Sequence, residues 1–194
     1  MSTWRVFDER AENYDRWYDE NKEIFEAELN CVEETIGELG NKTCIEVGVG
    51  TGRFASKLGV IGLDISRKVL EIAKKRGVEV IRGDAGLLPF KKESVDCILL
   101  VVTLCFLENP YRVIEEIKTC LRKEGILVVC VIPADSTLGK EYSQKKGPFY
   151  SIARFYSFDE LRELLKDFRI VNVKGIRIKG ENDFVCLKAV KAKR

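Results

Sequence analysis

The chain has 194 residues, of which 45% are hydrophobic and 33% are charged, and its formal net charge is +2. This composition is typical of one globular domain, and the near balance of charge argues against a broad surface for nucleic acid or anionic lipid. No apolar run approaches the roughly 20 residues of a membrane span, and the charged, aromatic segment Met1 to Glu20 is unlike a signal peptide.

The cysteine content favours a reducing compartment. Seven cysteines are scattered along the chain with no Cys-x-x-Cys pair, and the chain contains no histidine. We therefore expect no metal site, and reduced cysteines that act as small core residues in a cytoplasmic protein. One methionine together with abundant Glu, Lys and Arg favours a thermophilic source.

Predicted helices and strands alternate along the chain. Residues 7–39 are predicted to be helical, and a buried strand then leads into a glycine-rich turn at residues 44–52. Further strands are predicted at residues 60–63, 78–82, 96–102, 126–132, 170–178 and 183–190. Helices are predicted at Arg53 to Leu58, from Ser66 to Gly77, from Asn109 to Gly125 and from Ser157 to Lys166. This alternation predicts an α/β fold with a mostly parallel sheet and helices on both faces.

Three glycines at alternate positions, Gly48, Gly50 and Gly52, end the first predicted strand. Glycine has no Cβ to hold a ligand away, so this density of glycine indicates close approach of a ligand to the backbone. A dinucleotide fingerprint would need a small residue where Arg53 stands, and this disfavours an NAD site.

Two acidic residues follow the next two strands. Asp64 ends the second strand and is suited to accept hydrogen bonds from ribose hydroxyls, although it could instead serve the helix that begins near Ser66. Asp84 follows the third strand, where its carboxylate and the amide of Ala85 suit an adenine edge; a simple turn aspartate is the alternative.

These motifs in this order resemble the motif series of class I S-adenosylmethionine-dependent methyltransferases of the small-molecule, ubiquinone/menaquinone-methylase-like type, methyltransferase type 11. The resemblance covers roughly Thr43 to Ile132. It implies a Rossmann-like sheet of seven strands with the last strand antiparallel, and S-adenosylmethionine as cofactor. The implied cofactor-binding residues are Glu46, Gly48, Gly50, Thr51, Gly52, Asp64, Ile65, Asp84, Ala85, Thr103 and Leu104.

The chemistry expected of such an enzyme is an in-line displacement that requires mainly alignment of the reacting atoms. A histidine base is excluded, and Cys105 is more simply a packing residue, so no catalytic residue is assigned. Two aromatic segments are expected to supply acceptor contacts, although core packing or a dimer contact would also explain them. Their candidate residues are Tyr14, Trp17, Tyr18, Phe149, Tyr150 and Arg154.

The sequence therefore predicts a single methyltransferase domain over residues 1–194. Its parts are a helical cap (1–40), a cofactor-binding core (41–133), a lid or dimer segment (134–156) and a C-terminal helix with a strand pair (157–194). We expect a monomer or homodimer that methylates a small-molecule amine, phenol or quinone, or thiol, without nucleic-acid or membrane partners. The alternatives are a non-catalytic nucleotide-binding regulatory module and an NAD-linked oxidoreductase.

Overall fold

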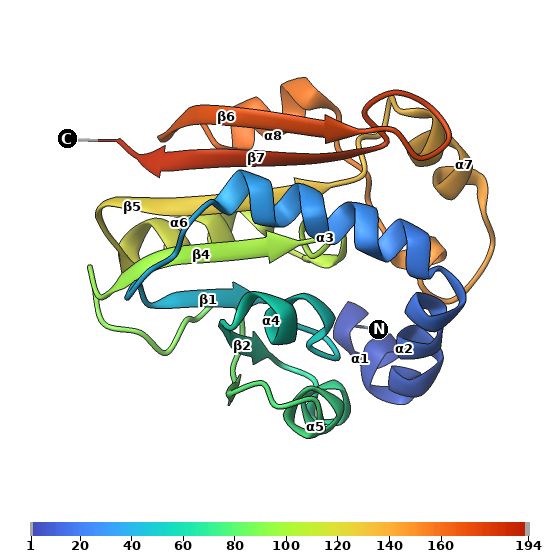
Figure 1. The fold of residues 1–194 in the computed structure, drawn as a ribbon, viewed down its shortest axis with the longest axis horizontal. Coiled ribbons are helices and arrows are strands. Elements are labelled where there is room, and N and C mark those ends of the chain that lie inside the picture. Colours follow the sequence, from blue (N-terminus) through green and yellow to red (C-terminus); the bar gives the residue numbers. More distant parts are fainter. Residues whose placement is uncertain (1, 193–194) are drawn as a thin grey trace.

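A computed structural model describes residues 2–192, which contain a seven-stranded sheet (Figure 1). Its strand order is β3-β2-β1-β4-β5-β7-β6, and β7 runs antiparallel to both of its neighbours. This arrangement confirms the predicted Rossmann-like sheet with its last strand antiparallel. The strands are β1 (Cys44–Val47), β2 (Ile61–Asp64), β3 (Val80–Arg82), β4 (Val95–Val101), β5 (Leu121–Val131), β6 (Phe168–Ile176) and β7 (Phe184–Lys191).

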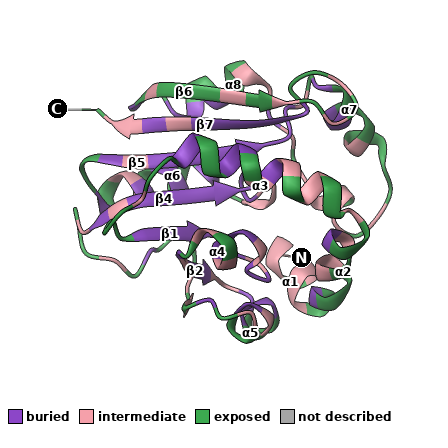
Figure 2. Ribbon diagram, viewed as in Figure 1, coloured by how far each residue is buried: buried purple, intermediate pink, exposed green. Residues whose placement is uncertain are grey.

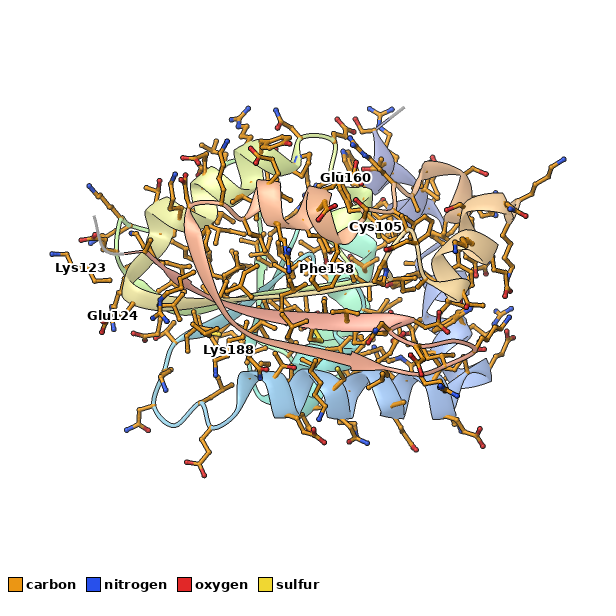
Figure 3. The ribbon with its side chains drawn as sticks, turned by 90° about the horizontal axis from the view of Figure 1, so that it is seen from above. Cys105, Lys123, Glu124, Phe158, Glu160 and Lys188 are labelled. Carbon is orange, nitrogen blue, oxygen red and sulfur yellow. A yellow bond between two sulfur atoms is a disulfide. The ribbon has the colours of Figure 1, made fainter. Side chains whose placement is uncertain are left out.

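Helices cover both faces of the sheet, as Figure 3 shows from the edge. One face carries α3 (Lys22–Ile36), α4 (Arg53–Leu58) and α5 (Arg67–Lys75), and the other carries α6 (Pro110–Cys120) and α8 (Phe158–Leu164). Strand β4 is buried along nearly its whole length, whereas the edge strand β6 is largely exposed (Figure 2). A strand covered on both faces must be apolar on both faces, which explains the apolar run Cys97 to Val101 in β4.

Helix starts follow the predicted capping residues. The Ser66 side chain accepts a hydrogen bond from the Val69 N–H, and the Asn109 side chain accepts one from the Arg112 N–H. Ser157 and Glu160 form a capping box at the start of α8. These contacts satisfy backbone N–H groups that have no partner within the first helical turn. Helix α4 has only six residues, so the short first crossover that the sequence predicts is confirmed.

Two predicted helices have different boundaries in the structure. The N-terminal helical segment is three helices, α1 (Thr3–Glu9), α2 (Ala11–Glu20) and α3, which are separated at Arg10 and Asn21. Helix α6 ends at Cys120 rather than near Gly125, because Leu121 already pairs with Val95 of β4. Burial of Leu121 in the core outweighs the helical spacing of its neighbours.

A disulfide joins β5 to β7 and corrects the expectation that all the cysteines are reduced. Cys130 lies directly opposite Cys186 in the antiparallel pair, with their Cα atoms 4.1 Å apart. This register brings together two residues 56 positions apart in the chain, which local sequence patterns do not predict. The free cysteines are Cys31, Cys44, Cys97, Cys105 and Cys120.

The remaining elements gather beyond the carboxyl ends of the parallel strands (Figure 1). Helices α1 and α2 lie there, together with α7 (Thr137–Gln144) and the 3₁₀ turns η1 (Leu104–Phe106) and η2 (Tyr150–Ile152). Within residues 2–192, no helix combines the length and apolar character needed to cross a bilayer.

Candidate active site

A cleft of about 340 Å³ lies at the carboxyl ends of β1 to β4. Ligands of open parallel sheets bind at this edge, because the loops that leave neighbouring strands converge there. Its walls come from the glycine loop, from the segments that follow β2, β3 and β4, and from α1 and α2. Of the predicted cofactor-binding residues, the lining contains Gly48, Gly50, Asp64, Ile65, Asp84, Ala85 and Thr103.

The glycine loop packs tightly against the end of β4. A Cβ atom on Gly48 would lie 2.2 Å from Thr103 Cγ2, which leaves no room for a side chain. The Thr103 hydroxyl donates a hydrogen bond to the Gly48 carbonyl over 3.2 Å. Gly48 and Gly50 also have positive φ angles of 75° and 55°. The cleft therefore meets bare backbone at this loop, as close approach by a ligand requires.

Asp64 is held in the cleft wall by two backbone groups. Its Oδ2 atom accepts a hydrogen bond from the Gly50 N–H and its Oδ1 atom accepts one from the Ser66 N–H, both over 2.9 Å. Burial raises the pKa of this carboxyl, and the two N–H groups oppose that rise. Each carboxylate oxygen can accept a further hydrogen bond from a ligand hydroxyl.

The first turn of α5 has a different anionic partner. Asp8 of α1 accepts hydrogen bonds from the Ser66 hydroxyl over 2.7 Å and from the Lys68 N–H over 3.1 Å. An anion in this place satisfies free N–H groups and interacts favourably with the helix dipole. The helix-anion role considered for Asp64 is therefore filled in part by Asp8.

Asp84 lies at the other end of the cleft and also stabilises its own turn. Its Oδ1 atom accepts a hydrogen bond from the Gly86 N–H over 2.8 Å. Arg112 Nε donates to the Gly86 carbonyl over 2.7 Å, and Arg112 itself lines the cleft. Asp84 therefore both stabilises a turn and lines the cleft, so its role in the turn does not exclude a contact with a ligand.

The other four predicted cofactor-binding residues are buried and are not among the residues that line the cleft: Glu46, Thr51, Gly52 and Leu104. Thr51 donates its hydroxyl hydrogen bond to Asp15 over 2.6 Å, away from the cleft. Gly52 has a packing role, because a Cβ there would lie 2.9 Å from the Ala73 Cβ on α5. Glu46 Oε2 has no hydrogen-bond partner among the described residues, and burial raises the pKa of this carboxyl well above its usual range.

Aromatic rings from three segments meet above the cleft. The Phe7 ring packs 5.2 Å from Tyr14, 4.8 Å from Phe106 and 5.1 Å from Phe149. Phe7, Tyr14 and Phe106 line the cleft, and Phe149 packs against Phe7 and Tyr14 without lining it. Two predicted acceptor residues, Tyr14 and Phe149, therefore belong to this cluster. Phe7 and Phe106 were missed because nothing in their local sequence distinguishes them from ordinary packing residues.

The other four predicted acceptor residues, like Phe149, lie outside the cleft lining. Tyr18 is buried, and its hydroxyl lies 3.0 Å from that of Tyr14. Trp17 packs edge-on against Tyr18. Tyr150 packs on Tyr142, and Arg154 lies over the Tyr156 ring at 4.8 Å.

The segment after β4 contains a strained residue and a protonated thiol. Val102 lines the cleft with a φ angle of 51°, a region that β-branched residues rarely occupy. The Cys105 thiol donates to the Val102 carbonyl over 3.6 Å. Burial raises the pKa of Cys105 to about 12, so it keeps its proton at neutral pH.

Comparison with known proteins gives consistent matches. A family model described as a methyltransferase domain matches residues 45–129. An uncharacterized protein of Methanocaldococcus jannaschii is 39% identical over 96% of this chain and 98% of its own length. A demethylmenaquinone methyltransferase of Thermotoga maritima is 32% identical over 75% of this chain and 67% of its own length.

A solved structure is similar over the whole chain. It is a crystal structure from Thermotoga maritima, named as an S-adenosylmethionine-dependent methyltransferase and possible histamine N-methyltransferase. It superposes with a TM-score of 0.88 and is 35% identical, covering 98% of this chain and 100% of its own.

Proposed function

Because this chain belongs to the class I S-adenosylmethionine-dependent methyltransferases, we propose that it methylates a small molecule by in-line displacement. The acceptor classes that we propose are an amine, a phenol or quinone, and a thiol. The cofactor is S-adenosylmethionine. One observation carries the proposal: bare glycine backbone and two strand-end carboxylates line the same cleft of about 340 Å³.

We propose a specific orientation of the cofactor in this cleft. Asp64 would accept the ribose hydroxyls, and Asp84 with the Ala85 amide would bind the adenine edge. The methionine end would lie over Gly48 and Gly50. The residues fit such a ligand, because Gly48 and Gly50 line the cleft without side chains and Asp64 is already oriented by two N–H groups.

The cofactor supplies an electrophilic methyl group on a sulfonium. The chain's own contribution is positioning, which can supply roughly 7–11 kcal/mol when the reacting atoms are aligned. Thr103 lines the cleft beside Gly48 and would border the reacting centre. With a pKa of about 12, the Cys105 thiol is a poor general base at neutral pH. We therefore propose that the acceptor enters with a free lone pair or loses its proton to solvent.

The aromatic cluster of Phe7, Tyr14, Phe106 and Phe149 is the proposed acceptor side of the cleft. Such rings favour flat apolar acceptors and, through their faces, cationic ones. The names of the relatives support both classes, since one is a demethylmenaquinone methyltransferase and another a possible histamine N-methyltransferase. Tyr18 packs against Tyr14 and Trp17 packs against Tyr18, so these two would act by supporting the rings, whereas Tyr150 and Arg154 pack on Tyr142 and Tyr156.

Calorimetric titration with S-adenosylmethionine, S-adenosylhomocysteine and NAD tests the cofactor. We expect both sulfur nucleotides to bind and NAD not to bind. Transfer of a labelled methyl group to a panel of amines, phenols, quinols and thiols then tests the acceptor. Failure of both sulfur nucleotides to bind would contradict the proposal, and binding without turnover of any acceptor would favour a regulatory module.

A further inference from the structure

An ionic network joins helix α2 to the glycine loop from the side away from the cleft. The Asp15 carboxylate accepts hydrogen bonds from Thr51 Oγ1 over 2.6 Å, from Arg53 Nε over 2.8 Å and from Arg76 Nη2 over 3.0 Å. Its side chain is only 18% exposed. Burial alone would raise the pKa of Asp15, but the hydrogen bonds from Arg53, Arg76 and Thr51 lower it to about 2. Asp15 is therefore an anion at every physiological pH.

Thr51, which lies between Gly50 and Gly52 in the glycine loop, has both its hydroxyl and its carbonyl in hydrogen bonds. Its hydroxyl donates to Asp15, and its carbonyl accepts a hydrogen bond from Arg76 Nη1. Its neighbours Gly50 and Gly52 have φ angles of 55° and 77°. Glycines lose more conformational freedom on ordering than other residues, so this loop needs outside contacts to keep one conformation.

Helix α2 contacts this loop on two sides. Tyr14 faces the cleft, where its Cε1 atom would lie 3.4 Å from a Cβ placed on Gly50. Asp15, the next residue, accepts a hydrogen bond from the Thr51 hydroxyl on the side away from the cleft. The Gly50 N–H is at the same time bound to Asp64, so movement of Thr51 would also disturb the proposed ribose contact.

We propose that Asp15 is a positioning residue that keeps the glycine loop in its cofactor-binding conformation. The inference rests on the proposed position of the methionine end over Gly48 and Gly50. A loop that is ordered before binding loses less entropy when the ligand arrives, so Asp15 increases affinity without touching the ligand. Neither Asp15, Arg53 nor Arg76 lines the cleft.

Asp19 provides a matched control on the same helix. Its carboxylate accepts a hydrogen bond from Arg53 Nη1 over 2.8 Å, but its side chain is 56% exposed, and its one described side-chain partner is Arg53 rather than Thr51. Asp15→Asn and Asp19→Asn each remove one negative charge, at positions four residues apart on α2. Only the first change weakens the contact with the glycine loop.

The test is the dissociation constant of S-adenosylhomocysteine, measured by calorimetry well below the unfolding temperature of each variant. We expect Asp15→Asn to raise the constant at least tenfold and Asp19→Asn to change it less than twofold. Thr51→Val should also raise the dissociation constant. In the Asp15→Asn/Thr51→Val double variant, the fold-increase in the dissociation constant should be smaller than the product of the fold-increases in the two single variants. Hydrogen exchange of residues 48–53 in the ligand-free protein should be faster in Asp15→Asn than in Asp19→Asn.

Other outcomes separate this inference from the proposed function. If the wild-type protein does not bind S-adenosylhomocysteine, the proposed function fails. If the wild type binds and Asp15→Asn binds within twofold of it, the positioning role alone fails. Equal losses in Asp15→Asn and Asp19→Asn, or fully multiplicative effects of Asp15→Asn and Thr51→Val, would likewise overturn it. Should Asp15→Asn not fold, the comparison of Thr51→Val with Asp19→Asn carries the same test.

Discussion

Asp64 has a structural role beside its proposed contact with ribose. It accepts the N–H groups of Gly50 and Ser66, so Asp64→Ala leaves two backbone donors without their acceptor. We expect the cofactor to bind about 1–3 kcal/mol more weakly, since hydrogen bonds to a charged group are lost. We also expect a lower melting temperature, which the sequence alone did not predict.

Asp96→Ala is the control for this change. The Asp96 carboxylate also accepts a backbone hydrogen bond, from the Thr43 N–H over 2.9 Å, but at the opposite end of the strands. Its loss should lower stability without changing the affinity for S-adenosylhomocysteine in a calorimetric titration. Unchanged affinity in Asp64→Ala would contradict the ribose assignment.

Glu28 on α3 makes stability depend on pH. Burial raises the pKa of this carboxyl from 4.5 to about 8, so the folded protein holds a proton that the unfolded chain releases between these values. The free energy of unfolding should therefore fall as the pH rises from about 4.5 to about 8. Glu28→Gln should make this slope shallower, with the remainder due to buried carboxyls such as Glu46, and raise the free energy of unfolding at pH 8.5 by roughly 2–5 kcal/mol.

Urea unfolding at pH 5 and pH 8.5 checks the prediction for Glu28. Glu33→Gln, at an exposed position on the same helix, is the control and should leave the slope unchanged. An equal slope in Glu28→Gln and the wild type would show that another group causes the pH dependence.

At the scale of elements, α1 covers part of the cleft without burying any of its own residues. It has no buried residues and contributes Thr3, Trp4 and Phe7 to the cleft lining. Hydrogen bonds attach it at both ends. Asp8 accepts one from the Ser66 hydroxyl at the start of α5, and the Thr3 hydroxyl donates one to the Phe106 carbonyl over 2.8 Å. A helix of seven residues is not stable by itself, so these attachments and the ring contacts of Phe7 hold it over the cleft.

Asp8→Ala should therefore accelerate ligand release. Loss of a capping interaction costs about 1 kcal/mol, which corresponds to a roughly fivefold faster dissociation of S-adenosylhomocysteine if closure limits release. Stopped-flow displacement measures this rate. Glu9→Ala, at an exposed position of the same helix, should leave it unchanged, and equal rates in the two variants would contradict a role for α1 in retention.

At the scale of the whole molecule, the disulfide closes a long loop of the chain. Cys130 and Cys186 are 56 residues apart and join β5 to β7, the strand next to the edge strand β6. Loop-closure entropy predicts about 4 kcal/mol of stabilisation for a loop of this length. We expect a reducing agent to lower the melting temperature of the wild type and to have no effect on a Cys130→Ser/Cys186→Ser variant.

Alkylation of the unfolded protein tests the same bond directly. Without a reductant, the five free cysteines should react, and with a reductant all seven should react. Mass spectrometry distinguishes the two patterns. Seven modified cysteines without a reductant would show that the pair is reduced in solution.

Local patterns predicted most of the sheet because the signals for strands and caps lie within a few residues. The glycine loop, the apolar run of β4 and the capping box at Ser157 are examples. The predicted boundaries of helices and strands were wrong where a residue pairs with a segment distant in the sequence. Leu121 has the spacing of a helical residue, yet it joins β5 because β4 lies beside it. For the candidate site, the sequence indicated eight residues of the cleft wall: Tyr14, Gly48, Gly50, Asp64, Ile65, Asp84, Ala85 and Thr103.

The sequence by itself determined the class of fold, the glycine loop and the acids at the strand ends, since chain order and short-range periodicity encode them. Only the tertiary structure decided which N-terminal residues reach the site. Asp8 and Asp15 are ordinary helix-surface acids in the sequence, and they become partners of α5 and the glycine loop because α1 and α2 fold over the sheet edge. The disulfide between Cys130 and Cys186 has the same origin, since contacts between distant segments depend on the packing of the whole chain rather than on local preference.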